Sequence, residues 1–468
     1  MLEQNQVIYE ETADWQLNTG GIKIVAKRLS GHFRTLKWLG MLTWLPFFLM
    51  PYLRWDGQQA ILFDIANRQY HFFDITLYPQ DLWLLALTLV FFALLLAVVT
   101  IFAGRVFCGF FCFQTVWTDI FTYIETKLEG KTPYQLKRFN DQSWNGSKLL
   151  RKMAKHSLWL LISLLTGISF TAWFSDAYLL WYNILTLQAS LTVWVILSLF
   201  TIGTYVLAGF MREQVCLWLC PYARLQSVMV DHDTHLPFYD SKRGEPRKKI
   251  SKQGDDGPAG SCVDCQMCVA VCPTGVDIRQ GQQHGCITCG LCIDACDDVM
   301  EKTGQEKGLI RYASYNEIAR NKPAQPFYRR SKLFLYLTLL LATLAIITYN
   351  IFNLSTFEFK VEHERQPLFV TLSDGSIQNK YTLRLLNKST QGIRAFFTVE
   401  GEEMEMAMHG INNKLTIEPG EITPVTLFVK ASAEKLENEI TPILFTAHIQ
   451  GEAEKRVQYQ SMFIGPVP

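Results

Sequence analysis

Charged side chains are missing from four long stretches of this 468-residue chain, none of which contains Asp, Glu, Lys, Arg or His. The four stretches are residues 82–103, 157–174, 187–210 and 333–352. About 20 apolar residues are needed to cross a bilayer, so the absence of charge excludes an ordinary soluble protein and predicts four spans. A shorter run at 38–53 contains two prolines, and we predict it as the first of five spans because flanking cations lengthen it.

Three further features are scarce: histidine is absent from the apolar runs, no N-terminal segment resembles a cleavable leader, and the C-terminal part lacks cysteine. No histidine lies in the five apolar runs, which excludes a haem held by two histidines within the membrane. Residues 1–14 are polar and acidic, so the sequence predicts no cleavable signal peptide. Cysteine is absent after residue 296, which excludes disulfides from the C-terminal part.

Lys and Arg are scarce in two of the predicted loops and abundant in the others. Residues 175–186 contain neither, and residues 54–81 contain only Arg54 and Arg68. The positive-inside rule therefore puts these two loops outside the cytoplasm of a bacterial inner-membrane, multi-pass protein. The predicted parts are a cytoplasmic segment 1–36, a four-span membrane domain 37–211 with a cytoplasmic loop at 104–156, a cytoplasmic segment 212–332, a fifth span 333–353 and a periplasmic domain 354–468.

Eight of the 12 cysteines form two runs with the spacing C-x-x-C-x-x-C-x-x-x-C within residues 255–312. In two-cluster ferredoxins the fourth cysteine of each run ligates the other cluster. The predicted ligands are Cys262, Cys265, Cys268 and Cys296 for cluster 1, and Cys286, Cys289, Cys292 and Cys272 for cluster 2. Zinc is the alternative, but zinc sites take four ligands in simple pairs and leave the third cysteine unexplained. The sequence therefore predicts two 4Fe-4S clusters and electron transfer.

The remaining cysteines form two C-x-x-x-C pairs, each just beyond the end of a predicted span. They are Cys108, Cys112, Cys216 and Cys220. Residues i and i+4 share one face of a helix, so each pair is expected to present two sulfurs together. The same order of spans and pair occurs twice, which predicts a parallel repeat with four thiols at the cytoplasmic membrane edge. Soft thiolates favour copper, ahead of a third cluster, and buried cysteines without a ligand role are the alternative.

Three strings around these cysteines resemble the FixG/CcoG family of cytochrome c oxidase accessory proteins, and the resemblance covers nearly the whole chain. The strings are residues 108–118, 212–224 and 292–300. The resemblance implies a polyferredoxin-like membrane protein that reduces Cu(II) to Cu(I), as a cupric reductase, during assembly of cbb3-type cytochrome c oxidase. It implies an oxidase subunit or another assembly factor as partner. The chain departs from the family at Phe113, where proline usually follows the cysteine.

From about residue 355 the helical pattern gives way to short alternating strands. Examples are residues 357–361, 381–385, 395–399 and 425–429. Roughly seven such strands over about 110 residues predict an immunoglobulin-like β-sandwich. Met404, Met406 and Met408 would share one face of a strand and offer thioethers to Cu(I), but filling the sandwich core is the favoured interpretation.

The predicted fold is a multidomain membrane protein with an α-helical bundle, an inserted two-cluster ferredoxin-like domain and a C-terminal immunoglobulin-like β-sandwich. Electrons are expected to enter from a cytosolic donor, pass through both clusters and leave at the four-thiol site, with copper as acceptor. Two alternatives remain, a quinone-linked electron carrier and a copper-binding assembly scaffold without redox turnover. The basic run 242–252 predicts attraction to anionic membrane lipid rather than to nucleic acid.

Overall fold

The computed structural model divides into two compact units. Unit 1 comprises Met1–Tyr52 and Leu85–Ile346, and unit 2 comprises Leu53–Leu84 and Ile347–Pro468. The chain passes between the units within helices α4 (Leu82–Ala103) and α16 (Ser331–Phe352), and after Tyr52. The structure describes residues 24–73, 75–249, 260–323, 325–353, 357–388, 392–401, 406–410, 415–418, 420, 422–432, 436, 438–450 and 456–466.

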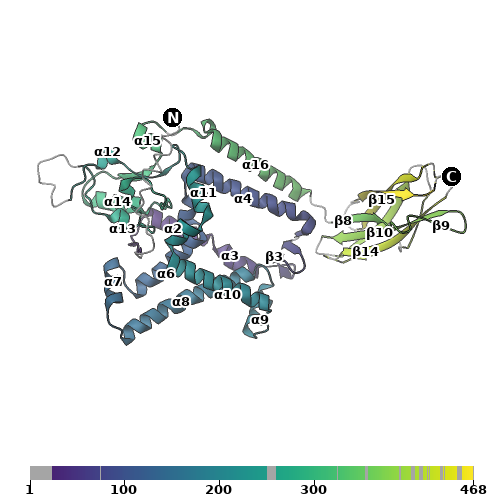
Figure 1. Cartoon of the computed structure of the whole chain (residues 1–468), viewed down its shortest axis with the longest axis horizontal. Coiled ribbons are helices and arrows are strands. Elements are labelled where there is room, and N and C mark those ends of the chain that lie inside the picture. Colours follow the sequence, from purple (N-terminus) through teal and green to yellow (C-terminus); the bar gives the residue numbers. More distant parts are fainter. Residues whose placement is uncertain are drawn as a thin grey trace. The chain divides into compact units, whose positions relative to one another are not determined.

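Four helices are long and apolar enough to cross a membrane. They are α4, α8 (Gly146–Thr171), α10 (Leu191–Val206) with its π-helical extension η3 (Leu207–Met211), and α16. All four coincide with predicted spans, although α8 begins well before residue 157. Helices α8 and α10 lie side by side (Figure 1). A Cβ added at Gly167 of α8 would lie 3.1 Å from the Leu197 carbonyl oxygen of α10, so the missing side chain permits close packing.

The first predicted span, residues 38–53, is an interrupted helix. The chain there forms α2 (His32–Leu42), α3 (Leu45–Leu49) and the 3-10 helix η1 (Met50–Tyr52). Pro46 lies in the first turn of α3 and Pro51 in η1. Proline cannot supply the N–H that a continuing helix needs. Within the described part of the chain, this segment therefore yields no helix of spanning length, whereas the other four predicted spans do.

The elements around the two cysteine pairs follow one another in the same order. The first series runs from α4 through α5 (Val106–Phe110) to α6 (Phe113–Leu128), and the second from α10 and η3 through the π-helix η4 (Val215–Leu219) to α11 (Pro221–Met229). A residue with positive φ follows each long helix, Gly104 in the first series and Arg212 in the second. Each lies four positions before the first cysteine of its pair. The two pairs therefore occupy equivalent places in a repeated local fold.

A small sheet closes the cysteine-rich segment. Strands β6 (Leu236–Tyr239) and β7 (Ile310–Ala313) pair antiparallel. Between them lie α12 (Ser241–Gly244), α13 (Met267–Ala270), η6 (Ile278–Gln280) and α14 (Leu291–Lys302). The connecting helices of unit 1 are α7 (Pro133–Asp141), α9 (Ala177–Leu185), α15 (Tyr315–Arg320) and η7 (Phe327–Arg329). The strand pairing holds the ends of the segment together, so its loops fold as one insert.

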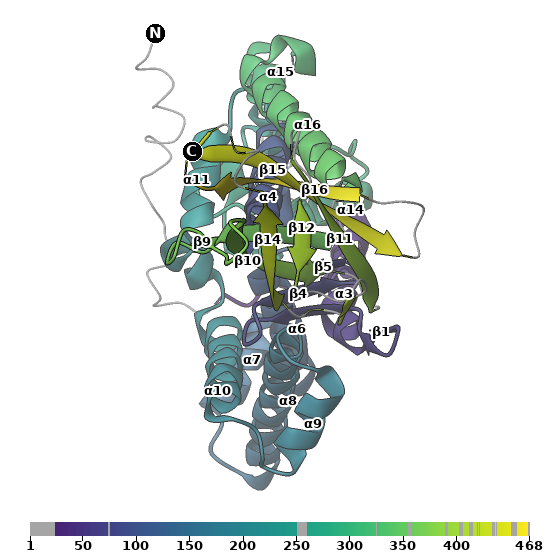
Figure 2. The same cartoon turned by 90° about the vertical axis from the view of Figure 1, so that its right-hand side faces the viewer.

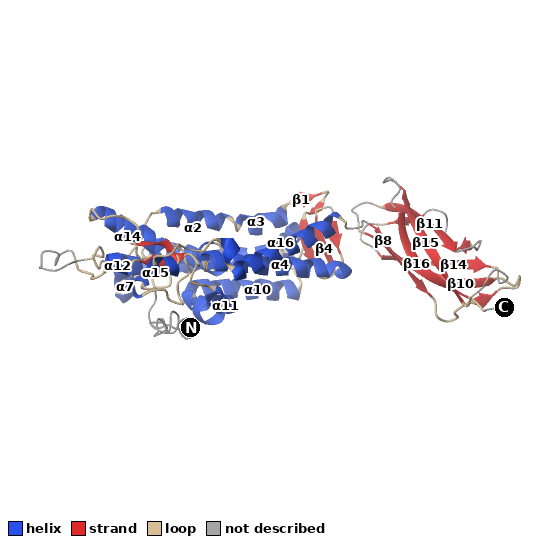
Figure 3. Cartoon of the chain, turned by 90° about the horizontal axis from the view of Figure 1, so that it is seen from above, coloured by secondary structure: helices blue, strands red, loops and turns tan. Residues whose placement is uncertain are grey.

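Unit 2 contains the predicted immunoglobulin-like sandwich, built from two antiparallel sheets (Figure 2). One sheet has the order β12-β14-β10-β8 with β9 beside β10, and the other has the order β13-β11-β15-β16. The strands are β8 (Phe357–His363), β9 (Val370–Thr371), β10 (Ile377–Asn387), β11 (Ile393–Gly401), β12 (Ala407–His409), β13 (Leu415–Ile417), β14 (Ile422–Ala431), β15 (Ile440–Gln450) and β16 (Arg456–Ile464). Figure 3, in which strands are red, shows that the sandwich consists of strands and connecting loops.

The sandwich core follows from the alternation seen in the sequence. Along β10 every second side chain from Ile377 to Leu385 is buried, including Tyr381 and Leu383. They pack with Phe445 of β15 and Phe463 of β16 in a single apolar cluster. Period-2 burial of this kind is what a sheet with one face against a second sheet requires.

Residues 54–81, predicted only as a loop, form short strands within unit 2. These elements are β1 (Arg54–Trp55), β2 (Gln58–Gln59), β3 (Ile61–Asp64), β4 (Gln69–Phe72), β5 (Ile75–Leu77) and the 3-10 helix η2 (Pro79–Asp81). The buried ammonium of Lys388, just after β10, lies 2.8 Å from Asp81 Oδ2 and 2.7 Å from Glu358 Oε1. This ion-pair cluster ties the small strands to the sandwich.

Candidate functional site

The four cysteines predicted for cluster 1 line one cavity of about 340 Å³. They are Cys262, Cys265, Cys268 and Cys296. The first two lie in the loop before α13, Cys268 lies in α13, and Cys296 lies in α14. Because α13 packs against α14, the fourth cysteine of the second run lies with the first three cysteines of the first run.

The four cysteines predicted for cluster 2 line a second cavity of about 360 Å³. They are Cys272, Cys286, Cys289 and Cys292. Cys268 lines this cavity as well as the first one, so the two cavities are neighbours. The structure thus groups the eight cysteines in the crossed pattern that their spacing predicts.

Both cavities suit a cluster of several atoms better than a single ion. Within the described ranges, no three Cys, His, Asp or Glu side chains converge closely enough to hold one metal ion. Four cysteines around each cavity instead match thiolates at the corners of a cube. Burial raises the pKa of Cys268, Cys286 and Cys296 to about 12, so ligation must release thiol protons.

The other four cysteines lie near one another, from four different elements, but within the described residues no three of them converge closely enough to hold one metal ion. Cys108 lies in α5 and Cys216 in η4, while Cys112 and Cys220 precede α6 and α11. Burial is the main cause that raises the pKa of both Cys108 and Cys216 to about 12. The nearby thiolates of Cys112 and Cys220 raise both values further. The Cys108 thiol donates a hydrogen bond to Gln226 Oε1 at 3.2 Å. We call this group of four cysteines the thiol site.

The expectation that each pair lies on one helix is wrong. Helix α5 ends at Phe110, and Cys112 is extended (φ −60°, ψ 130°) as the N-cap of α6. Cys220 is likewise the extended N-cap of α11. In both pairs the N–H of the second cysteine closes a wide turn, to the Phe107 carbonyl at 2.9 Å and the Val215 carbonyl at 2.8 Å. The second sulfur of each pair therefore belongs to a helix N-terminus, where free N–H groups favour an anion.

The thiol site adjoins the cluster 2 cavity. Cys108 and Cys289 belong to the same buried apolar cluster. A Cβ added at Gly109 would lie 2.7 Å from the Ile287 carbonyl oxygen, so the two backbones touch. The loop that carries the first cysteine pair therefore packs directly on a loop that carries cluster 2 cysteines.

A buried cation, Arg105, lies beside both groups of cysteines. Its guanidinium donates to Gln226 Oε1 at 3.4 Å and to the His284 carbonyl oxygen. Its charge opposes the effect of burial on the pKa of Cys108 and also acts on Cys286. In the sequence, Arg105 is one of the cations in the 104–156 loop that indicate its cytoplasmic side. The only feature of the sequence that could have indicated its role beside the cysteines is its position three residues before Cys108.

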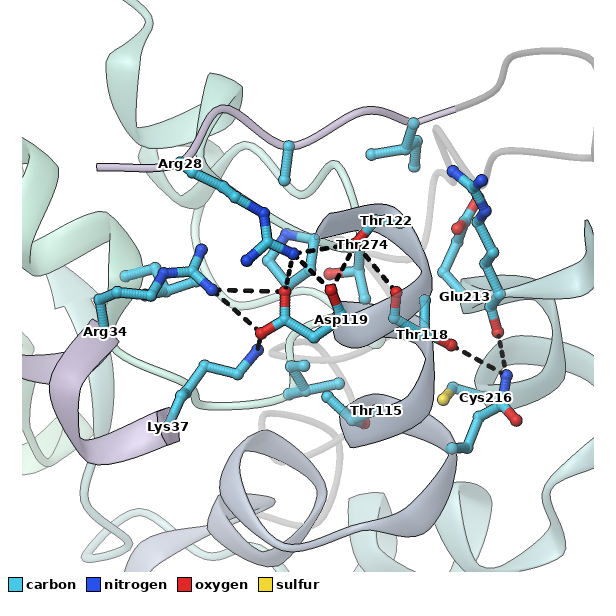
Figure 4. Close-up of a pocket in the computed structure, with 17 residues that line it drawn as sticks. Arg28, Arg34, Lys37, Thr115, Thr118, Asp119, Thr122, Glu213, Cys216 and Thr274 are labelled. Carbon is cyan, nitrogen blue, oxygen red and sulfur yellow. Dashed lines mark hydrogen bonds and ion pairs between the residues drawn. The ribbon is translucent and has the colours of Figure 1, made fainter. Parts of the chain in front are cut away.

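A third cavity, of about 640 Å³, was not foreseen (Figure 4). Arg28, Arg34 and Lys37 converge there on Asp119, at 2.6, 3.0 and 3.4 Å. Burial opposes ionisation of this carboxyl, but the three cations hold the pKa of Asp119 below its ordinary value. Cys216 of the thiol site lines the same cavity.

Two of the three methionines predicted as a weak Cu(I) site, Met406 and Met408, belong to the sandwich. Met408 lies in β12, and the side chains of Met406 and Met408 pack against the core of unit 2. Met404 lies outside the described residues. This packing favours the interpretation of Met406 and Met408 as core side chains.

Three sequence families match the chain. A family described as "4Fe-4S dicluster domain" matches residues 211–315, "4Fe-4S binding domain" matches residues 85–131, and "IG-like fold at C-terminal of FixG" matches residues 347–466. The first range contains all eight predicted cluster ligands, and the second contains Cys108 and Cys112. The chain is therefore an iron-sulfur protein with an immunoglobulin-like domain.

Full-length relatives extend this result. Protein RdxA of Cereibacter sphaeroides is 41% identical over 390 residues, covering 81% of this chain and 82% of the relative. Nitrogen fixation protein FixG of Rhizobium meliloti is 36% identical over 451 residues, covering 87% and 86%. A crystal structure of a FixG-related protein from Vibrio parahaemolyticus is 26% identical and covers 24% of this chain and 97% of its own, with a TM-score of 0.22. Identity along most of both full-length relatives shows that the chain belongs to the FixG family, as a membrane protein that transfers electrons through iron-sulfur centres.

Proposed function

We propose that this protein passes electrons from a cytosolic donor to the thiol site and reduces Cu(II) there to Cu(I), for assembly of cbb3-type cytochrome c oxidase. One observation carries the proposal. The thiol site and the cluster 2 cavity share a buried apolar cluster through Cys108 and Cys289. Electron transfer falls off steeply with distance, so direct contact between these segments supports exchange between them.

The residues have distinct roles in this proposal. When bound, the 4Fe-4S clusters supply one-electron transfer, and one electron converts one Cu(II) into Cu(I). Cys108, Cys112, Cys216 and Cys220 offer soft sulfur donors, which prefer Cu(I). Arg105 offsets the negative charge that builds up when these thiols ionise, and Gln226 orients the Cys108 sulfur through its hydrogen bond.

The charge distribution supports one orientation in a bacterial inner membrane. We infer that residues 1–36, 104–156 and 212–332 face the cytoplasm and that residues 354–468 face the periplasm. A reducing cytoplasm keeps the thiols of both clusters and of the thiol site free. The interrupted helix at 32–52 is the remaining crossing, because the N-terminal segment and the 104–156 loop then lie on the same side.

A second candidate is a third iron-sulfur cluster at the thiol site. The match of residues 85–131 to a 4Fe-4S binding domain includes Cys108 and Cys112, which favours this reading. Chemical analysis separates the candidates. Two clusters require about eight iron atoms per chain, and three require about twelve.

The test of copper reduction is anaerobic. The purified protein is reduced, stoichiometric Cu(II) is added, and cluster reoxidation is followed together with Cu(I) capture by a chromogenic chelator. Two variants, Cys108→Ser with Cys112→Ser and Cys216→Ser with Cys220→Ser, are compared with a Met406→Leu and Met408→Leu control. We expect Cu(I) to appear in step with cluster oxidation in the wild type and the control, and to be lost in both cysteine variants. If the reduced clusters are not reoxidised by Cu(II), the proposal is overturned.

A further inference from the structure

The cavity shown in Figure 4 lies where four segments of unit 1 meet. Its lining comes from the chain before and within α2, from α6, from the turn that leads to Cys216, and from the loops that carry cluster 2 cysteines. The lining includes Arg28, Arg34, Lys37, Asp119, Arg212 and Cys216. The space in it that the centre of a water molecule can occupy is about 50 Å³, enough for several water molecules or one small anion.

The cavity carries an excess of positive charge. Four cations, Arg28, Arg34, Lys37 and Arg212, line it with the two carboxylates Asp119 and Glu213. Arg212 is already paired with Glu125 at 2.6 Å, so the excess comes from the other three cations. A single carboxylate, Asp119, balances three of these cations. An excess of cations around one buried carboxylate is costly unless a further anion joins them. The electrostatics therefore favour a negatively charged guest.

Two cationic donors in the lining have no hydrogen-bond partner. They are Nε of Arg34 and Nη1 of Arg212, and the two residues are only 8% and 3% exposed. Arg212 is held in place by its Nε, which donates to the Gly209 carbonyl at 2.9 Å, and by Nη2, which pairs with Glu125 at 2.6 Å. Buried guanidinium donors are normally satisfied, so two residues that line this cavity retain unused hydrogen-bonding capacity.

The remaining polar groups define the chemistry of an acceptor that would suit this cavity. Four threonines, Thr115, Thr118, Thr122 and Thr274, line the cavity together with the cations. Figure 4 shows Thr122 near Arg28, and Thr122 Oγ1 accepts from Arg28 Nη2 at 3.1 Å. Guanidinium, ammonium and hydroxyl groups together suit the several oxygens of a phosphate.

We propose that this cavity binds a phosphate group, presented either by a phospholipid headgroup or by a small soluble compound. The bound anion would lie beside Cys216 and beside Thr274 and Leu291, which flank cluster 2 cysteines. The site does not depend on copper reduction, because it is defined by cations and hydroxyls alone. Asp119 competes with the anion for the same cations.

The test uses the purified full-length protein, stripped of lipid, in a neutral detergent. Binding is measured by calorimetric titration with inorganic phosphate and, separately, with short-chain phosphatidic acid, with short-chain phosphatidylcholine as the zwitterionic reference. Binding of inorganic phosphate identifies a soluble source, and binding of phosphatidic acid alone identifies a headgroup. In either case we expect Arg34→Gln to weaken affinity about tenfold and Asp119→Asn to strengthen it.

Lys127→Gln is the matched control, because Lys127 is an exposed cation of α6 that does not line the cavity. It should leave affinity unchanged. Thr118→Val keeps every charge and should also weaken binding. This second variant tests the site even if the Arg34 variant fails to fold. Visible and EPR spectra of the clusters report folding in each sample. Absence of binding to both probes, or weaker binding in Asp119→Asn, would overturn the proposal and leave an ion-pair cluster with a purely structural role.

Discussion

Gly109, between the cysteines of the first pair, lies against Cys289 of cluster 2, so that a Cβ at position 109 would be 3.1 Å from the Cys289 Cα. The same atom would be 2.7 Å from the Ile287 carbonyl oxygen. Both neighbours are backbone and cannot rotate away. The backbone at Gly109 therefore lies directly against the loop that carries cluster 2 cysteines.

Gly109→Ala should force these two loops apart. We expect a loss of about 1–3 kcal/mol in unfolding free energy from overpacking, together with slower oxidation of reduced clusters by Cu(II). Gly203→Ala is the control, because a Cβ at Gly203 of α10 meets nothing within 4 Å. Thermal unfolding in detergent and stopped-flow absorbance measure the two effects. If Gly109→Ala and Gly203→Ala have the same unfolding free energy and the same rate of cluster oxidation, the contact at Gly109 contributes to neither stability nor electron transfer.

Paired cysteine variants can test the crossed ligand sets. Cys262→Ser with Cys296→Ser removes two ligands from the cluster 1 cavity, so one cluster should remain, with about four iron atoms per chain. Cys286→Ser with Cys296→Ser removes one ligand from each cavity and should damage both clusters. Iron analysis and EPR of the reduced proteins distinguish the two samples. The reverse outcome would mean that each run binds its own cluster.

Asp119 should make stability depend on pH. Its folded pKa lies below the ordinary value because three cations outweigh the cost of burial. Its contribution is therefore complete above the unfolded pKa of about 4 and is lost as pH falls through the folded pKa. The difference in unfolding free energy between wild type and Asp119→Asn should be constant from pH 7 to about 5 and shrink below that. A difference that grows on acidification would contradict this account.

The sequence predicts well what depends on local spacing. The eight cluster cysteines lie in short loops and in two adjacent helices, so their spacing constrains which sulfurs can meet. The alternation in β10 likewise predicts a two-faced strand, because burial follows the period of the strand itself. The prolines at 46 and 51 indicate from the sequence that the apolar run 38–53 is irregular. They do not predict that the helix breaks between Leu42 and Leu45.

What the sequence did not predict depends on contacts between distant segments. Arg28 and Asp119 are 91 positions apart, and nothing local to either one indicates their pairing. Arg105 resembles any basic residue at the end of a span until the fold brings it near Cys286. The four-residue spacing of Cys108 and Cys112 wrongly predicted that both lie on one helix. Helix α5 ends at Phe110, between the two cysteines, so the helical repeat does not continue to Cys112.

Arg105→Gln should weaken Cu(I) binding at the thiol site. The buried guanidinium opposes the effect of burial on Cys108 and Cys216, and its loss leaves their thiolates less stable. We expect a loss of about tenfold in Cu(I) affinity, equal to about 1.4 kcal/mol, in a chelator competition. Arg105→Lys keeps the charge and should lose less. If both variants fail equally, the hydrogen bond to the His284 carbonyl is the important contribution and the charge is not.

Lys388→Ala should detach residues 54–81 from the sandwich of unit 2. The buried ammonium is the shared partner of Asp81 and Glu358, at 2.8 and 2.7 Å, and its removal leaves two carboxylates facing one another. Breaking a buried ion pair on one side costs about 3–5 kcal/mol. We expect faster amide exchange across residues 54–81 in the full-length protein, measured by mass spectrometry. Lys380→Ala is the matched control, since its pair with Glu364 is largely exposed and should contribute less than about 1 kcal/mol. Unchanged exchange in Lys388→Ala would show that other contacts hold these strands in place, among them the hydrogen bond from Gln69 Nε2 to the Gly420 carbonyl at 3.0 Å.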